Sequence, residues 1–311
     1  MEDIYKIAGN GGISDEELKE ALQRSLVGRM LKKVLILPPD FTRFHSQAGK
    51  ITSIYYQLLT DMGAQVDIMP ALGTHEPVSK EQWEIMFKGI PYENMIVHDW
   101  RHDVVKIGEV PASYLEEITE GLWHEPVSVE INRRVMDESY DLIISPGQVV
   151  PHEVIGMANH SKNLFVGVGG SDMINKSHMV GAVYGMERMM GKDHTPVRKI
   201  FDYGMEHFLS NRPILFVLTV CTAPVSESEL YFTDSDVEKY FEVASSSSST
   251  RSARFPRPWK RSSWRRKRIL TSSSTASRNA WSISIPASSR VHGSAIRPSI
   301  VPAWRLRTAE S

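Results

Sequence analysis

The sequence predicts an α/β fold with a layered, largely parallel sheet, and three observations support this prediction. Short apolar runs, each long enough for one buried strand, recur along the first 220 residues. They alternate with segments of helical pattern, which is the order found when helices cover a parallel sheet. The length of 311 residues is enough for two domains, or for one large α/β domain with an appendage.

Local signals predict the elements in chain order. Ser14 and Glu17 form a capping-box pattern, and leucines at 18, 22 and 26 continue a helical spacing. The apolar run at 34–37 predicts a buried strand that Pro38 and Pro39 end. Beyond it we expect a helix over 49–62, a strand over 66–69, a helix over 79–87, a short strand over 95–97, a helix over 127–136, a strand over 142–144, and further strands over 163–168 and 214–220.

Composition limits the class of protein. Apolar residues make up 41% and charged residues 23%, which is typical of a globular chain. No apolar run reaches about 18 residues, so no membrane span is expected, and the amino terminus lacks the pattern of a secretory signal. The single cysteine, Cys221, excludes an internal disulfide framework and a cysteine-rich zinc site. We therefore expect a cytoplasmic protein.

A net charge of −1 conceals two parts of opposite charge. From Ser245 onward, 12 Arg and 2 Lys accompany a single acidic residue, Glu310. The preceding 244 residues carry 22 basic and 36 acidic side chains. The final segment also holds 19 serines and four of the seven tryptophans. This shift divides the chain into an N-terminal domain, 1–244, and a Ser/Arg-rich tail, 245–311.

The tail has no sustained helix or strand period. Its charge and low hydrophobic order predict disorder, and the abrupt loss of acidic residues after Ala244 indicates a shift of reading frame, which is our leading hypothesis. The alternative is a genuine basic tail, in which arginines and interleaved tryptophans such as Trp259 and Trp264 bind RNA or single-stranded DNA by charge and stacking. Of these two hypotheses, the nucleic-acid-binding tail is the less favoured.

Polar side chains follow three of the predicted strands. Asp40 and Arg43 come after the first strand, His75 after the second, and His152 after the strand at 142–144. In parallel sheets, ligands bind beyond the carboxyl ends of the strands, so these side chains are candidates for one site. Residues at strand ends also often serve only as helix caps, and this pattern alone favours neither interpretation.

Read together, these segments resemble the nickel-pincer lactate racemase family. Asp40-Phe41-Thr42-Arg43 is similar to its Asp-His-Thr-Arg-Pro segment, and Leu72-Gly73-Thr74-His75 to its Thr-Gly-Phe-His segment. His152 is followed ten residues later by Lys162, and Lys162 sixteen residues later by His178. These spacings match the family's catalytic histidine, cofactor-bearing lysine and nickel-ligand histidine. The resemblance implies that the N-terminal domain is a lactate-racemase-like catalytic domain.

Two aromatic residues depart from the family's first motif. Phe41 stands where the family has His, and Phe44 where it has Pro. They suggest a more apolar pocket. In addition, the residues 157–161 stand where the family has a glycine-rich stretch before its lysine. Together these departures put lactate itself in doubt as the substrate but leave the reaction type unchanged.

The resemblance implies a cofactor, pyridinium-3,5-bisthiocarboxylic acid mononucleotide, whose two thiocarbonyl groups hold nickel. This nickel-pincer nucleotide takes hydride from a 2-hydroxy acid and returns it to the other face, which racemises or epimerises the substrate. Lys162 is the implied attachment point, and His178 the implied nickel ligand, since imidazole suits nickel. The implied partners are a small 2-hydroxy acid and the accessory enzymes that build the cofactor.

The resemblance assigns the remaining candidates to the substrate and to the cofactor's neighbourhood. His75 and His152 match the two acid–base residues, one for each enantiomer. Arg43 matches the cation that holds the substrate carboxylate, which a guanidinium can do with two parallel hydrogen bonds. Asp40 is assigned to the surroundings of the cofactor.

Two other interpretations remain. Family members continue into a second α/β domain that nothing after about 244 resembles, so the chain can be a catalytically incompetent product that keeps a cofactor-binding domain. A nicotinamide-dependent dehydrogenase is disfavoured, because no Gly-x-Gly-x-x-Gly turn follows an early strand.

Overall fold

The computed structural model describes residues 4–7, 13–221 and 280–284, and it confirms the predicted α/β class. The largest sheet has the strand order β1-β10-β9-β6-β2-β3. Four neighbouring strands, β9, β6, β2 and β3, are parallel, while β10 and β1 add antiparallel pairs at one edge. The strands of this sheet are β1 (Ile4–Ile7), β2 (Lys33–Ile36), β3 (Gln65–Ile68), β6 (Leu142–Gln148), β9 (Ile214–Val220) and β10 (Ala280–Ser284).

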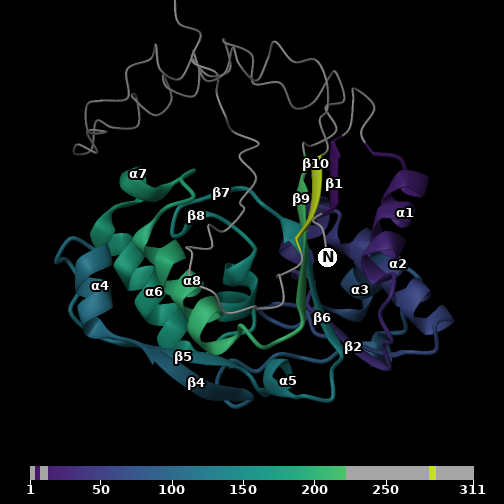
Figure 1. Cartoon of the computed structure of the whole chain (residues 1–311), viewed down its shortest axis with the longest axis horizontal. Helices are drawn as coiled ribbons and strands as arrows, with labels where there is room; N and C mark the ends of the chain where they lie inside the picture. Colours follow the sequence, from purple (N-terminus) through teal and green to yellow (C-terminus); the bar gives the residue numbers. More distant parts are fainter. Residues whose placement is uncertain (1–3, 8–12, 222–279, 285–311) are drawn as a thin grey trace, which may run out of the picture.

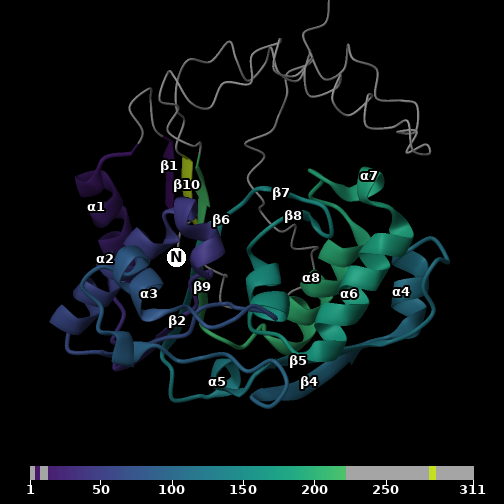
Figure 2. The same ribbon diagram turned by 180° about the vertical axis from the view of Figure 1, so that it is seen from behind.

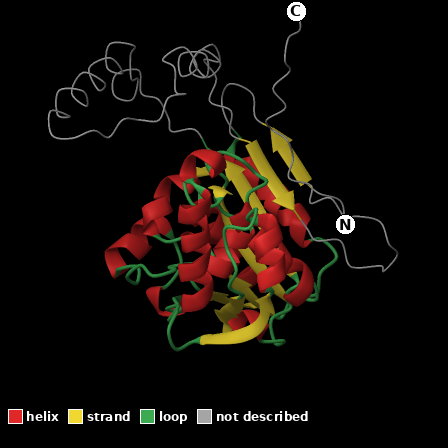
Figure 3. Cartoon of the chain, turned by 90° about the vertical axis from the view of Figure 1, so that its left-hand side faces the viewer, coloured by secondary structure: helices red, strands yellow, loops and turns green. Residues whose placement is uncertain are grey.

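Helices cover both faces of the sheet (Figures 1 and 2). The group on one side is α1 (Asp15–Leu26), α2 (Ala48–Asp61) and α3 (Lys80–Met86). The group on the other side includes α4 (Ala112–Ile118), α6 (Ser171–Tyr184), α7 (Met186–Met189) and α8 (Pro196–Phe208), together with the antiparallel pair β4 (Val104–Val110) and β5 (Val127–Asn132). Shorter elements are η1 (Phe41–Ser46), η2 (Tyr92–Asn94), η3 (Asn163–Gly167), α5 (Arg133–Met136), β7 (Pro151–His152) and β8 (Gly156–Met157). Figure 3 shows the helices in front of the sheet from the side.

Alternating residues of the central strands supply a separate core on each face. In β2, Val34 and Ile36 belong to the cluster beneath α1, α2 and α3, and Leu35 belongs to the opposite cluster. All three side chains are fully buried. A strand that is buried on both faces reads as a continuous apolar run, which is why this strand was predictable from its sequence.

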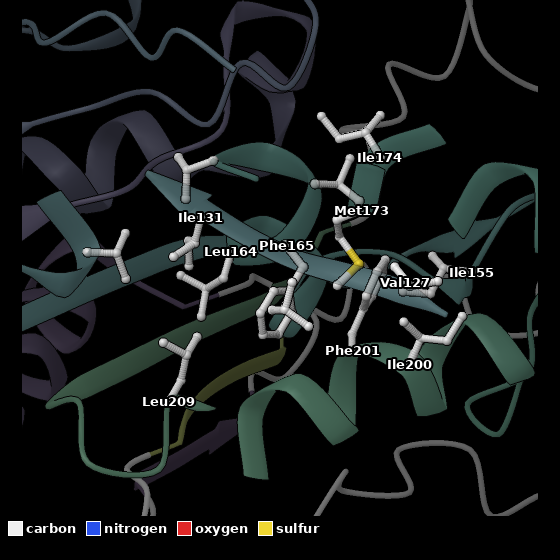
Figure 4. Packing of buried hydrophobic residues seen from close by; sticks show 14 of the residues in the cluster. Val127, Ile131, Ile155, Leu164, Phe165, Met173, Ile174, Ile200, Phe201 and Leu209 are labelled. Carbon is white, nitrogen blue, oxygen red and sulfur yellow. The ribbon is translucent and has the colours of Figure 1, made fainter. Parts of the chain in front are cut away.

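The core opposite α1–α3 is built around an aromatic ring from an irregular segment (Figure 4). Phe165 of the π-helical turn η3 is fully buried and stacks with Phe201 of α8 at a centroid distance of 5.9 Å. A Cβ atom at Gly204 would lie 2.6 Å from the Phe165 ring, so a glycine is needed where α8 passes over it. This packing fixes α8 close to the segment that carries Lys162.

Most predicted elements are confirmed, and three are wrong. The helix predicted over 127–136 is strand β5 followed by the single turn α5, because its buried residues alternate with period two. The strand predicted over 163–168 is the buried turn η3. The segment 95–97 forms only a single bridge, between Met95 and Ile68. The first helix has the predicted capping box between Ser14 and Glu17.

The predictions for the tail fall almost entirely outside the described residues. The exception is 280–284, which forms strand β10, paired antiparallel with β9 and β1, and is not disordered chain. The division at 244/245, the shifted frame and the disorder of the rest of the tail stay predictions. Among the residues that the structure describes, none of the helices meets the length and hydropathy that a bilayer-spanning segment needs.

Replacing Gly156 with alanine is expected to destabilise the fold strongly. Gly156 has a φ of +94°, and a Cβ there would lie 2.1 Å from the carbonyl oxygen of Lys192 and 2.9 Å from that of Met189. Backbone atoms cannot rotate away, so we expect a loss of about 2–4 kcal/mol in the free energy of unfolding, measured by urea denaturation.

The matched control is Gly121→Ala. Gly121 also has a positive φ, +79°, but no atom lies within 4 Å of a Cβ built there. It should lose only the conformational cost of about 1 kcal/mol. Equal losses in the two variants would contradict the proposed clash.

Candidate active site

One pocket gathers all six side chains that the sequence singles out. It has a volume of about 290 Å³ and lies beyond the carboxyl ends of β2, β3 and β6, where ligands bind in parallel sheets. The six lining residues in question are Asp40, Arg43, His75, His152, Lys162 and His178. The structure therefore brings the candidates together, while their individual roles stay predictions.

Asp40 combines a helix cap with a contact to a pocket histidine. It is buried, and its Oδ1 accepts hydrogen bonds from the backbone N–H and the hydroxyl of Thr42, at 3.1 and 2.5 Å, which caps η1. Its Oδ2 pairs with Nδ1 of His75, which follows β3. Asp40 thus serves as a helix cap, as residues at strand ends often do, and it is also the partner of a candidate catalytic residue.

The partner of His75 determines which ring nitrogen is available. A carboxylate oxygen can only accept, so Nδ1 of His75 donates to Asp40. In neutral His75 the lone pair is therefore on Nε2, and Asp40 fixes the orientation of the ring. The His75 side chain is 55% exposed, so a ligand can reach it.

His152 is held in the opposite tautomer. It is buried, and its Nδ1 accepts a hydrogen bond of 3.1 Å from the backbone N–H of Val154. The proton of the neutral ring is therefore on Nε2. Burial, followed by repulsion from Lys162, lowers the pKa of His152 to about 4, so the ring is neutral at pH 7 and offers a hydrogen-bond donor.

Lys162 directly precedes the turn η3 and has an amine suited to nucleophilic attack. Burial lowers its pKa to about 8, and the positive charge of Arg43 adds to the effect. At pH 7 the amine is then neutral in about a tenth of the molecules, against about one in three thousand for an ordinary lysine. A lysine whose amine is partly neutral at physiological pH can form a covalent bond to a carbonyl-type carbon.

His178 lies on α6 with one ring nitrogen free for a metal. Its Nδ1–H donates to the carbonyl oxygen of Ile174, one helical turn earlier, at 2.6 Å. This bond fixes the tautomer and leaves the lone pair on Nε2, as in metal-bound histidines whose other nitrogen donates to a carbonyl. Within the described residues, no three His, Cys, Asp or Glu side chains group together as a metal site.

The expectation of a more apolar pocket is wrong. Neither Phe41 nor Phe44 is among the residues that line it. Phe41 packs against the core beneath α1, α2 and α3, and Phe44 lines a separate pocket together with residues of α2 and α3. The two departures from the family's first motif therefore do not change the walls of the pocket.

Sequence reasoning missed several polar residues of the pocket. Glu153 lies beside His152, with 3.7 Å between Oε2 and Nδ1, and Gln148 and Asn163 also line the pocket. Asn163 donates to the carbonyl of Leu37 and to the hydroxyl of Ser145, which ties η3 to β6 and to the residue that follows β2. A signal for Glu153 was its position next to a candidate histidine.

Comparisons with known proteins identify the family and support the fold. A family model described as the lactate racemase N-terminal domain matches residues 13–190, which include all six candidates. A crystal structure of a structural-genomics target protein from Thermotoga maritima is similar at 23% identity and a TM-score of 0.61, covering 75% of this chain and 59% of that chain. The lactate racemase apoprotein from Thermoanaerobacterium thermosaccharolyticum is similar at 19% identity and a TM-score of 0.52, covering 69% and 50%. No curated protein matches. At these identities the two structures support the fold, and this chain spans between half and three fifths of their length.

Proposed function

The chain belongs to the lactate racemase N-terminal domain family, and from that premise we propose that it racemises or epimerises a 2-hydroxy acid with a nickel-pincer nucleotide. The observation that carries the proposal is that Lys162 and His178 line the same pocket. The first has a partly neutral amine, and the second a ring nitrogen free to bind a metal.

The residues of the pocket fit this cofactor. Lys162 would hold it covalently through its amine, and Nε2 of His178 would bind the nickel. When bound, the cofactor supplies the hydride acceptor that a 2-hydroxy acid needs, because its α-hydrogen is not acidic beside a carboxylate.

The remaining side chains act on the substrate. The Arg43 guanidinium would hold the carboxylate, since it is exposed at the pocket and bonds only to its neighbour Thr42 among the described residues. His75 would take the hydroxyl proton on Nε2, because Asp40 holds its Nδ1–H. A small 2-hydroxy acid is therefore the proposed substrate.

The tautomer of His152 gives it a different starting role. With Nε2–H, it would donate a hydrogen bond to the substrate oxygen. To act as the second base, His152 has to give up the bond from the Val154 N–H. The two histidines are thus inequivalent before substrate binds.

The test is to produce the chain together with the enzymes that build the cofactor and to measure its intact mass and peptide masses. We expect a mass increase on the peptide containing Lys162, absent in Lys162→Arg and kept in Lys106→Arg. Lys106 is an exposed lysine paired with Glu109 outside the pocket, and it serves as the matched control.

A known family member loaded in the same cells shows that cofactor is present. With that control positive, an unmodified Lys162 would contradict the proposal. That result would favour the alternative of a non-catalytic homologue.

A further inference from the structure

The turn that leads into Lys162 has an unusual backbone. Asn159 and His160 are consecutive non-glycine residues with positive φ, +65° and +57°. Such conformations persist only where the surroundings hold them, and they cluster at functional sites. What holds this turn therefore determines where the Lys162 amine lies.

A buried arginine from another element holds it. Arg198, in the first turn of α8, is 3% exposed and donates to the carbonyl oxygens of Met157 and Asn159 and to the hydroxyl of Ser161. The bond to Ser161 is 2.7 Å, and both terminal nitrogens reach the carbonyl of Asn159, at 3.4 and 3.3 Å. A planar guanidinium is suited to this task, because its donors form a rigid fork.

One carbonyl connects this fork directly to Lys162. The oxygen of Asn159 also accepts the backbone N–H of Lys162, at 3.3 Å, and the oxygen of His160 accepts that of Asn163, at 3.0 Å. These two bonds begin the helical turn from which the Lys162 side chain enters the pocket. Arg198 therefore contacts the acceptor on which that turn depends.

We propose that Arg198 is a positioning residue, which clamps the turn at 157–161 and so presents the Lys162 amine to the cofactor. The inference rests on the proposed function, in which Lys162 is the attachment point. Arg198 does not line the pocket. It acts through the backbone of the turn and through its charge.

The charge of Arg198 affects the same amine. Burial lowers the pKa of Lys162 most, Arg43 next, and Arg198 adds a further decrease, while Glu153 and Asp40 oppose it. Losing the Arg198 charge, or letting the turn open toward water, would shift the pKa of Lys162 in the same direction, upward. Both effects would reduce the neutral amine at pH 7.

The experiment compares Arg198→Met with Arg198→Lys on the full chain without cofactor. One readout is hydrogen exchange of the Lys162 and Asn163 amides. The other is the pH dependence of Lys162 acetylation, followed by peptide mass.

In Arg198→Met these two amides should exchange at least about tenfold faster than in the wild type, and the midpoint of acetylation should move upward from about pH 8. The same amides in Arg198→Lys should also exchange faster, because the single nitrogen of an ammonium cannot take the places of both terminal guanidinium nitrogens, but the midpoint should shift less.

The matched control is Arg212→Met. Like Arg198, Arg212 donates to a backbone carbonyl, that of Asp137 at 2.6 Å, and in both arginines Nε has no partner among the described residues. Arg212 makes no hydrogen bond to the turn at 157–161. It should leave both readouts unchanged.

The proposal is overturned if a folded Arg198→Met matches the wild type in both readouts, or if Arg212→Met changes them equally. If Arg198→Met does not fold, Arg198→Lys decides by its amide exchange. No cofactor enters these measurements, so their failure is distinct from a failure of the Lys162 adduct test.

Discussion

Replacing His178 with alanine is expected to remove nickel from the chain produced with the cofactor-building enzymes. On the proposed function His178 is the protein's own ligand, with Nδ1–H fixed on the carbonyl of Ile174 and Nε2 free. Loss of a direct ligand should lower bound nickel by about tenfold to a hundredfold or more, since even supporting residues of metal sites have effects of this size. Metal content per chain, measured by elemental analysis, gives the result.

A second histidine supplies a closely matched control. His207 lies on α8, and its Nδ1 is 3.0 Å from the carbonyl oxygen of Tyr203, also one turn earlier. It has the same local geometry as His178 but does not line the pocket. His207→Ala should therefore keep the nickel.

The same samples separate metal binding from covalent attachment. The mass increase on Lys162 should persist in His178→Ala, because the lysine does not depend on the imidazole for its bond. Nickel that stays in His178→Ala at the wild-type level would show that another residue is the ligand. Loss of both nickel and adduct would indicate that α6 has been disturbed as a whole.

The predictable part of this site lies where the sheet itself brings residues together. Asp40, His75 and His152 each follow a parallel strand, and the carboxyl ends of such strands meet at one edge. A short apolar run ended by prolines or polar residues therefore predicts both the strand and the position of its last side chains.

The elements that were mistaken depend on packing between distant segments. The stretch at 127–132 pairs with β4 and buries Val127, Val129 and Ile131 on one face, a two-residue period that a helical interpretation overlooked. The turn η3 has the apolar composition of a strand, but Asn163 ties it to β6 and to the residue that follows β2, and Phe165 fills the core. Short apolar runs do not by themselves distinguish these outcomes.

Arg198 was beyond reach of sequence reasoning for the same reason. It lies 37 positions after Ser161, outside any motif, and only the packing of α8 on Phe165 brings its guanidinium to the turn. Phe41 and Phe44 are the opposite case. Their place inside a motif predicted that they line the pocket, but in the structure neither of them does.

Replacing Asp40 with asparagine is expected to lower the rate of racemisation by about 10²–10⁴-fold, the range for loss of a positioned general base. Asparagine is as good a helix cap as aspartate, so η1 should keep its start and the fold its stability. The change removes the carboxylate that holds the Nδ1–H of His75. The Asn amide can donate to Nδ1 instead, which moves the proton to Nε2 and takes away the base.

A second aspartate–histidine pair provides the control. Oδ2 of Asp99 is 2.7 Å from Nδ1 of His102 in a pair that is exposed and does not line the pocket. Asp99→Asn should leave the rate unchanged. Nitrogen-15 NMR of the histidine rings, with no cofactor needed, should show His75 protonated on Nδ1 in the wild type and on Nε2 in Asp40→Asn.

The loss in rate must be the same from either enantiomer. The two enantiomers of a 2-hydroxy acid with one stereocentre have equal free energy in water, so the equilibrium constant is one and kcat/KM in the two directions has to match in every variant. Single-turnover oxidation of each enantiomer escapes this constraint, because it stops at the 2-keto acid. There, Asp40→Asn should slow mainly the oxidation of the enantiomer whose hydroxyl faces His75.

A changed tautomer with unchanged rates from both enantiomers would show that His75 is not the base. Equal slowing of both would mean that the inequivalence of His75 and His152 in the free protein is lost once substrate binds.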